Sequence, residues 1–127
     1  CLSRGLGDVY KRQTVYYFKR VRNRAGTPLA IMENWVPIEI AELTREGLES
    51  RGLYTLLRQQ GINFRLAQQK IGAAVATNDQ AQLLQTSSGS ALVTMSRTAT
   101  DDIGRRAETG RHVYRADSYS FEMTLSA

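Results

Sequence analysis

Residues 14–37 predict a β-hairpin, and this feature limits the possible folds more than any other. Thr14–Arg24 is rich in β-branched and aromatic residues, which favour strands. Ala25-Gly26 suits a two-residue turn, because glycine adopts positive φ without strain. The return strand is expected over Pro28–Val36, and Pro37 ends it. Strands joined by so short a turn must pair antiparallel.

The remaining pattern adds further strands and two short helices. An apolar stripe predicts a helix over 53–60, and Gly61 suits the position just past its end. Thr77-Asn-Asp-Gln80 matches a capping box, which predicts a helix through Leu84. Residues 38–50 are expected to form a loop with a short helical turn. Further strands are expected over 63–76, 91–99, 106–114 and the alternating residues Tyr119, Phe121, Met123 and Leu125. The expected class is α+β, with an antiparallel sheet of about five or six strands and short flanking helices.

The chain of 127 residues is interpreted as one domain preceded by a tail. Residues 1–13 show no sustained period of 2 or 3.6 and look like a non-native tail or translated vector scar. An ordinary disordered N-terminus is the alternative interpretation. The expected domain therefore spans residues 14–127. It carries 14 basic and 11 acidic residues, whereas the whole chain has a formal net charge of +5.

Composition and missing motifs exclude several classes of protein. One cysteine, Cys1, and one histidine, His112, leave no internal disulfide and no Cys/His metal cluster. No apolar run reaches the length of a membrane span, and no secretory signal is recognisable, so a reducing cytoplasm is expected. The chain has no P-loop, no GxGxxG and no GxSxG, and nothing local supports a catalytic triad. We therefore expect no enzyme activity and no cofactor, and His112 is expected to be a structural or solvated side chain.

The hairpin offers a candidate anion site. Arg20 and Arg22 lie on one face of the first strand, because strand side chains alternate. A two-residue turn pairs Phe18 with Glu33, which places Glu33 diagonally from Arg20 on that face. Two guanidinium groups and a carboxylate there could clamp an anionic polyol or acid. The alternative is a solvated face with a weak cross-strand ion pair, and spacing alone favours it.

Four ordered stretches favour the binding site over the solvated face. They are YFKRVRNRAGTPLAIMENWVP at 17–37, GLYTLLRQQG at 52–61, AQQKIGAAVATNDQAQLL at 67–84 and RTATDDIGRRAETGRHVYRADSYSFEM at 97–123. Together they resemble the UTRA domain, the effector-binding module of the HutC subfamily of GntR-type bacterial transcription regulators. The resemblance implies a chorismate-lyase-like fold that binds a small cytoplasmic metabolite, such as a sugar phosphate, a phosphonate or urocanate. It also implies a homodimer whose attached winged helix-turn-helix domains bind operator DNA.

The resemblance assigns effector contacts to seven positions. Arg20 and Arg22 match the family's anion-binding arginines, and Gly52 stands where sugar-phosphate sensors carry serine. A backbone amide at the following helix start could replace that serine hydroxyl. The remaining matches are Glu33, Tyr54, Glu108 and Tyr114. The alternatives are core packing for the two tyrosines and a surface carboxylate for Glu108. Ala25 replaces the family's turn aspartate, which weakens the turn signal only.

From the resemblance we expect the chain to lack the DNA-binding domain and the opening of the family's own domain, which would leave an exposed sheet edge.

Two further hypotheses stay open at this stage. An enzyme related to chorismate lyase would use the same arginines and a glutamate to hold a carboxylic acid, but only by analogy of fold. Direct nucleic-acid binding would use the basic residues Lys19, Arg20, Arg22 and Arg24 beside the aromatic residues at 16–18.

Overall fold

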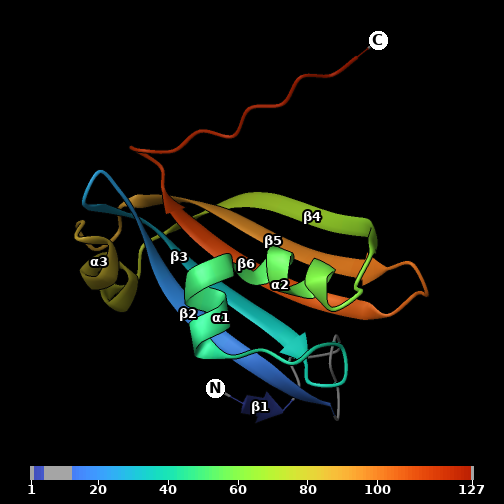
Figure 1. Cartoon of the computed structure of the whole chain (residues 1–127). Coiled ribbons are helices and arrows are strands. Elements are labelled where there is room, and N and C mark those ends of the chain that lie inside the picture. Colours follow the sequence, from blue (N-terminus) through green and yellow to red (C-terminus); the bar gives the residue numbers. More distant parts are fainter. Residues whose placement is uncertain (1, 5–12, 127) are drawn as a thin grey trace.

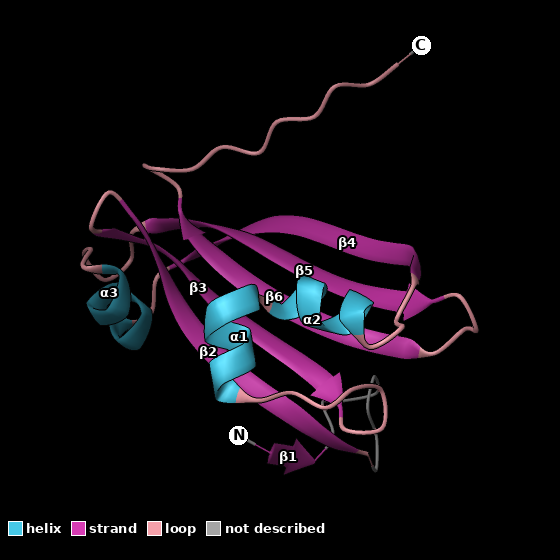
Figure 2. Cartoon of the chain, viewed as in Figure 1, coloured by secondary structure: helices cyan, strands magenta, loops and turns pink. Residues whose placement is uncertain are grey.

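Six antiparallel strands form one sheet in the computed structural model, which describes residues 2–4 and 13–126 (Figures 1 and 2). The strand order across the sheet is β1-β2-β3-β6-β5-β4. The strands are β1 (Leu2–Arg4), β2 (Thr14–Arg24), β3 (Thr27–Pro37), β4 (Phe64–Val75), β5 (Ala91–Asp101) and β6 (Arg106–Arg115). The helices are α1 (Arg45–Arg51), α2 (Leu53–Gln59) and α3 (Asn78–Leu84). The predicted α+β class and antiparallel sheet are confirmed.

The β2–β3 hairpin has the predicted turn but not the predicted register. Ala25 and Gly26 both adopt positive φ, as a tight hairpin turn requires. The register shifts next to Asn23, so that Arg20 pairs with Met32 and Phe18 pairs with Asn34. The predicted pairing of Phe18 with Glu33 is therefore wrong. A bulge inserts one extra residue into β3, and a one-residue slip moves every later side chain to the opposite face.

Short helices cover both faces of the sheet. Leu53, Leu56 and Leu57 of α2 pack with Phe18 and Val36 in one apolar cluster, as the predicted stripe requires. Figure 1 shows α1 and α2 in front of the sheet and α3 farther back. The helix α3 buries Ala81 and Leu84 against Ile31, Leu92 and Val113, whose side chains belong to the opposite face. These two apolar clusters hold the helices on opposite sides of the sheet.

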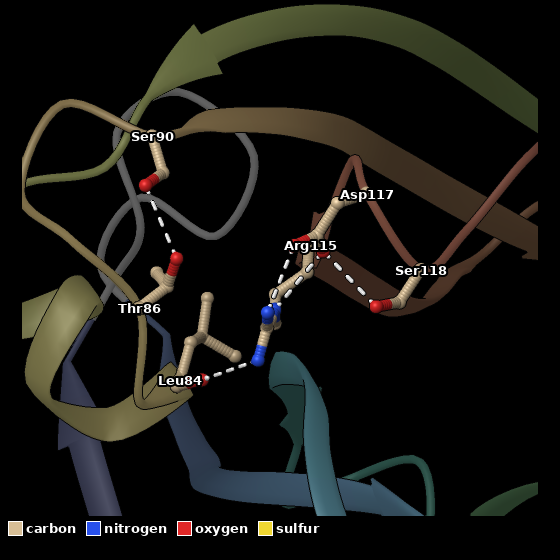
Figure 3. Close-up of polar contacts among 6 residues, drawn as sticks. All are labelled: Leu84, Thr86, Ser90, Arg115, Asp117 and Ser118. Carbon is tan, nitrogen blue, oxygen red and sulfur yellow. Dashed lines mark hydrogen bonds and ion pairs between the residues drawn. The ribbon is translucent and has the colours of Figure 1, made fainter.

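Local contacts fix the position of α3. Thr77 and Gln80 form the predicted capping box, with each side chain accepting from the other residue's backbone amide. Arg115, at the end of β6, donates to the Leu84 carbonyl at 3.3 Å and makes two hydrogen bonds to Asp117 (Figure 3). Arg115 therefore ties the end of α3 to the end of the central strand β6.

The predicted last strand is wrong. Residues 116–126 contain no strand, and Phe121, Met123 and Leu125 are exposed. Figure 1 shows this segment running away from the sheet. The strand before it, β6, lies between β3 and β5, so both of its edges are already paired. Alternation of apolar residues makes a strand only where a partner edge is available.

The exclusion of residues 1–13 from the fold also needs correction. Leu2–Arg4 pairs with Thr14–Tyr16 of β2 as a short edge strand. An edge strand has free backbone groups on one side, and a nearby extended segment can satisfy them whatever its side-chain pattern. Residues 1 and 5–12 lie outside the described part of the chain, and a non-native origin for this stretch stays a prediction.

Candidate functional site

The sheet ladder brings polar side chains from three strands to one face. Asn34 of β3 pairs with Gly110 of β6, and Gly110 pairs with Arg97 of β5. Directly paired residues point to the same face of a sheet. Asn34 and Arg97 therefore flank Gly110, while Glu108 and His112 precede and follow it on the same face. This face also carries Arg20, whose row is next to that of Asn34.

A hydrogen-bonded network joins this face to α2. Arg20 Nη2 donates to Asn34 Oδ1 at 3.2 Å, and Asn34 Nδ2 donates to Glu108 Oε1 at 2.9 Å. The Tyr54 hydroxyl donates to Glu108 Oε2 at 3.0 Å, and Arg97 Nε lies 3.7 Å from the same oxygen. The Arg97 guanidinium also lies over the Tyr54 ring. We call these five residues the Glu108 cluster.

Glu108 is a fully buried carboxylate at the centre of this cluster. Burial raises its pKa, while Arg97, the Asn34 hydrogen bond and Arg20 act in the opposite direction. Two guanidinium groups and two hydrogen-bond donors surround the two carboxylate oxygens. Burying so many polar groups is costly for folding, which is more typical of a binding site than of a stability element.

His112 and Tyr114 extend the cluster along β6. Burial, and then Arg97, Arg20 and Arg22, lowers the pKa of His112 to about 4, so the imidazole is neutral near pH 7. His112 Nδ1 lies 3.2 Å from the Tyr114 hydroxyl. Burial raises the pKa of Tyr114, which keeps its proton. When Tyr114 donates that proton to Nδ1, Nε2 of His112 carries the imidazole hydrogen.

Aromatic and thioether side chains border this polar face. The Tyr114 ring stacks on Tyr119 with ring centroids 4.1 Å apart. Met32 and Met95 pack against the apolar cluster that contains Tyr114. The site therefore combines a polar floor with an apolar end, which is the usual composition of a small-molecule site.

Three buried nitrogens on this face have no hydrogen-bond partner within the described part of the chain. They are Arg20 Nε, Arg97 Nε and His112 Nε2. Arginine Nε always carries hydrogen, and the Arg97–Glu108 distance is too long for a hydrogen bond. Buried polar groups are normally satisfied, so unpaired donors on one face are a binding feature. They would suit an anionic or hydroxylated ligand.

The structure brings together some of the predicted site residues and separates others. Arg20, Tyr54 and Glu108 belong to the cluster, and Tyr114 contacts His112 on the same sheet face. Arg22 lies on the same face but is exposed. Two of the predicted site residues, Glu33 and Gly52, do not lie on this face.

Glu33 lies on the opposite face of the sheet from Arg20. It pairs with Lys19 and accepts a 2.6 Å hydrogen bond from the Tyr17 hydroxyl. Burial and Glu33 raise the pKa of Tyr17 to about 12. The Gly52 amide donates to the Leu48 carbonyl at 3.2 Å, so it is already used within the helical segment. Neither residue is therefore placed to contact a ligand on the face of the Glu108 cluster.

Sequence reasoning missed Asn34, Arg97 and His112. The bulge in β3 places Asn34 on the polar face, where the unbulged register would place Glu33. Arg97 is one arginine in a predicted strand, where it lies on the same face as Met95, and nothing in its neighbourhood marks it as a binding residue. His112 was interpreted as structural because a lone histidine has no local partner pattern. Among residues 2–4 and 13–126, no three His, Cys, Asp or Glu side chains gather as a metal site.

The helices of the described chain are all too short or too polar to cross a bilayer. Comparison with known proteins then identifies relatives. Residues 7–120 match the family described as the UTRA domain. Over 109 residues the chain is 28% identical to the HTH-type transcriptional repressor NagR of Bacillus subtilis. The match covers 85% of this chain and 45% of NagR, so the chain spans about half the length of that curated relative.

Solved structures agree with this match. A protein described as a transcriptional regulator from Streptomyces coelicolor is 41% identical, with a TM-score of 0.83, over 88% of this chain and 75% of that one. The ligand-binding domain of a GntR-family regulator from Bordetella bronchiseptica superposes with a TM-score of 0.88 over 99% of this chain and 84% of that one. Its identity is 24%, so this second likeness concerns the fold alone.

Proposed function

The chain belongs to the UTRA domain family, and on that premise we propose that it binds a small anionic metabolite, such as a sugar phosphate or a carboxylate. In the whole protein, this binding controls how a winged helix-turn-helix domain holds operator DNA. The mechanism is a population shift, in which the effector favours one arrangement through differential contacts.

One observation supports this proposal above the others. Nitrogens of Arg20, Arg97 and His112 that have no hydrogen-bond partner among the described residues lie on one sheet face, beside a buried carboxylate. An anion would accept hydrogen bonds from these donors and offset the charge of two guanidinium groups. Arg22 lies on the same face and adds positive charge at the exposed end. A surface with this donor set favours negatively charged ligands of small size.

A thermal-shift screen of the 127-residue chain tests the proposal. The panel holds amino-sugar phosphates, other sugar phosphates, alkylphosphonates and urocanate. A ligand at about a hundred times its dissociation constant adds roughly 2.7 kcal/mol to the free energy of unfolding. The double variant Arg20→Ala, Arg22→Ala should lose this shift and keep a cooperative melt.

A matched control removes the same charge elsewhere. Arg58 and Arg65 are exposed residues outside the Glu108 cluster. The double variant Arg58→Ala, Arg65→Ala should keep the ligand-induced shift of the unchanged chain. Equal loss of the shift in both double variants would mean that net charge, and not the site, controls binding.

We propose no catalytic activity for this domain. Its named relatives are transcriptional regulators, although Arg20, Arg97 and Glu108 could also hold a dicarboxylic acid. The alternative, a chorismate-lyase-like enzyme, predicts pyruvate release from chorismate. We expect none in a coupled pyruvate assay, and measurable release would contradict the proposal.

The partners of the domain are also proposals. Direct nucleic-acid binding is disfavoured because Lys19 and Arg20 point to opposite faces and Arg20 bonds to Asn34. A homodimer is proposed from the family, and the exposed length of β4 offers a free edge for it. Light scattering after size exclusion would give the mass of the particle. We propose a cytoplasmic location for the protein, because control of DNA binding requires access to DNA.

A further inference from the structure

The strand β4 forms one edge of the sheet. It has 12 residues and pairs only with β5 among the described strands. Figure 1 shows it at the end of the sheet away from β1. Residues 65–75 are all exposed, so no helix of the described chain covers them. The backbone groups on the outer side of β4 are therefore open to another strand.

This edge lacks the features that usually keep an exposed strand from pairing with another chain. Such edges are typically short, or carry proline or several charges. Residues 64–75 contain no proline, and only Arg65 and Lys70 are charged. Three large apolar side chains are exposed on β4, namely Leu66 at 66%, Ile71 at 41% and Val75 at 67%. A long, mostly uncharged edge with exposed apolar side chains favours association.

The residue pattern of β4 is complementary to itself in one register. A two-fold axis perpendicular to the sheet sets β4 antiparallel to β4 of a second copy and keeps each face on its own side. When Ile71 lies opposite Ile71 of the second copy, Val75 lies opposite Ala67, so apolar residues meet on one face. On the other face Lys70 lies opposite Gly72, which has no side chain to obstruct the lysine stem. A register centred on Lys70 would instead oppose two like charges.

We infer that β4 pairs antiparallel with β4 of a second copy, with Ile71 at the two-fold axis. Residues 67–75 of each copy then pair across the interface, and one sheet runs through both copies. The ends carry opposite charges, because this register places Arg65 opposite Thr77, two residues before the exposed Asp79. The interface is smaller than the standard size, so we expect dimer formation to depend on concentration. This inference rests on the homodimer of the proposed function and names the surface that forms it.

A disulfide at the axis tests the register. Directly opposed residues of an antiparallel pair have Cα atoms about 4.5–5.5 Å apart, which a disulfide can span. In a chain whose native cysteine is removed by Cys1→Ser, Ile71→Cys should form a covalent dimer under mild oxidation. Ala73→Cys is the matched control, because the register holds its two copies about 14 Å apart along the strand. Equal cross-linking of the two variants, or more in Ala73→Cys, would overturn the inference.

The mass of the particle tests the interface without a cross-link. Light scattering after size exclusion is measured over a series of concentrations. Ile71→Lys places two like charges at the axis and should give a monomer. Leu83→Lys is the matched control, because Leu83 is exposed to a similar extent, 38%, but belongs to α3. It should dimerise like the unchanged chain, and melting curves show whether each variant is folded.

The remaining outcomes separate this inference from the proposed function. A dimer that persists in folded Ile71→Lys keeps the homodimer and overturns its placement on β4. The same holds if Ile71→Lys dimerises but a chain ending at Ser118 does not, since the exposed C-terminal segment then forms the interface. If the unchanged chain is monomeric at every concentration, the inference and the homodimer both fail. Stabilisation by a panel anion would still support the anion sensor in that case.

Discussion

Asn34 donates a 2.9 Å hydrogen bond to Glu108 although 74 residues separate them in the chain. Both side chains are buried, and Asn34 accepts from Arg20 through its other amide atom. The amide therefore has a defined orientation, with its oxygen toward Arg20 and its nitrogen toward Glu108. This arrangement couples β2, β3 and β6 through one side chain.

Asn34→Ala should destabilise the domain. It leaves a buried carboxylate with one donor fewer and the half-buried guanidinium of Arg20 without its acceptor. We expect the free energy of unfolding to fall by about 1–3 kcal/mol, measured by urea denaturation. Asn63→Ala is the control, because Asn63 bonds to Asp102 at the surface. A loss as small as that of the control would contradict the structural role of Asn34.

Arg20 and Arg22 should contribute unequally to effector binding. Arg20 is half-buried and bonded into the Glu108 cluster, whereas Arg22 is exposed. A pre-ordered guanidinium loses less freedom on binding and acts in a less polar environment. Arg20→Ala should therefore weaken binding of a panel ligand more than Arg22→Ala does, as calorimetric titration would report. The reverse order would place the anion at the exposed end of the hairpin.

His112 should make stability depend on pH in a defined window. Its pKa is about 4 in the folded chain, below its ordinary 6.5, because of burial and then Arg97, Arg20 and Arg22. Between these values the unfolded chain binds a proton that the folded chain does not bind. The contribution of His112 to the free energy of unfolding therefore decreases as the pH falls from about 6.5 toward 4.

The variant His112→Phe isolates this contribution. Other groups with shifted pKa values, such as Glu108 and Asp101, are present in both chains, so the comparison largely removes their effect. The unchanged chain should lose stability relative to the variant as pH falls through the window. Parallel curves of melting temperature against pH would contradict a depressed pKa at His112.

Tyr119 should contribute to stability, whereas the residues after it should not. Its ring stacks on buried Tyr114, while Phe121 is exposed. Tyr119→Ala should lower the free energy of unfolding by about 0.5–1.5 kcal/mol more than the loss of buried apolar area alone would, as expected for an aromatic pair. Phe121→Ala should change the melting temperature little. Equal effects would mean that the whole C-terminal segment packs on the domain.

Local signals were enough to predict most of the elements. The turn at Ala25-Gly26, the stripe of α2 and the capping box of Thr77 depend on residues close in the chain. Their physical causes are local steric limits and short-range hydrogen bonds. The resemblance on four ordered stretches also pointed to the UTRA family, to which the chain belongs.

Non-local contacts decided the site. The bulge in β3 exchanged Glu33 for Asn34 on the binding face, and no local rule predicts where a strand slips by one residue. The last strand failed for a related reason, since both edges of β6 were already paired. By itself, the sequence determined the strands β2 to β6, the helices α2 and α3, and the family of this protein. Only the tertiary structure decided which polar side chains surround Gly110, because register and strand order depend on contacts between distant residues.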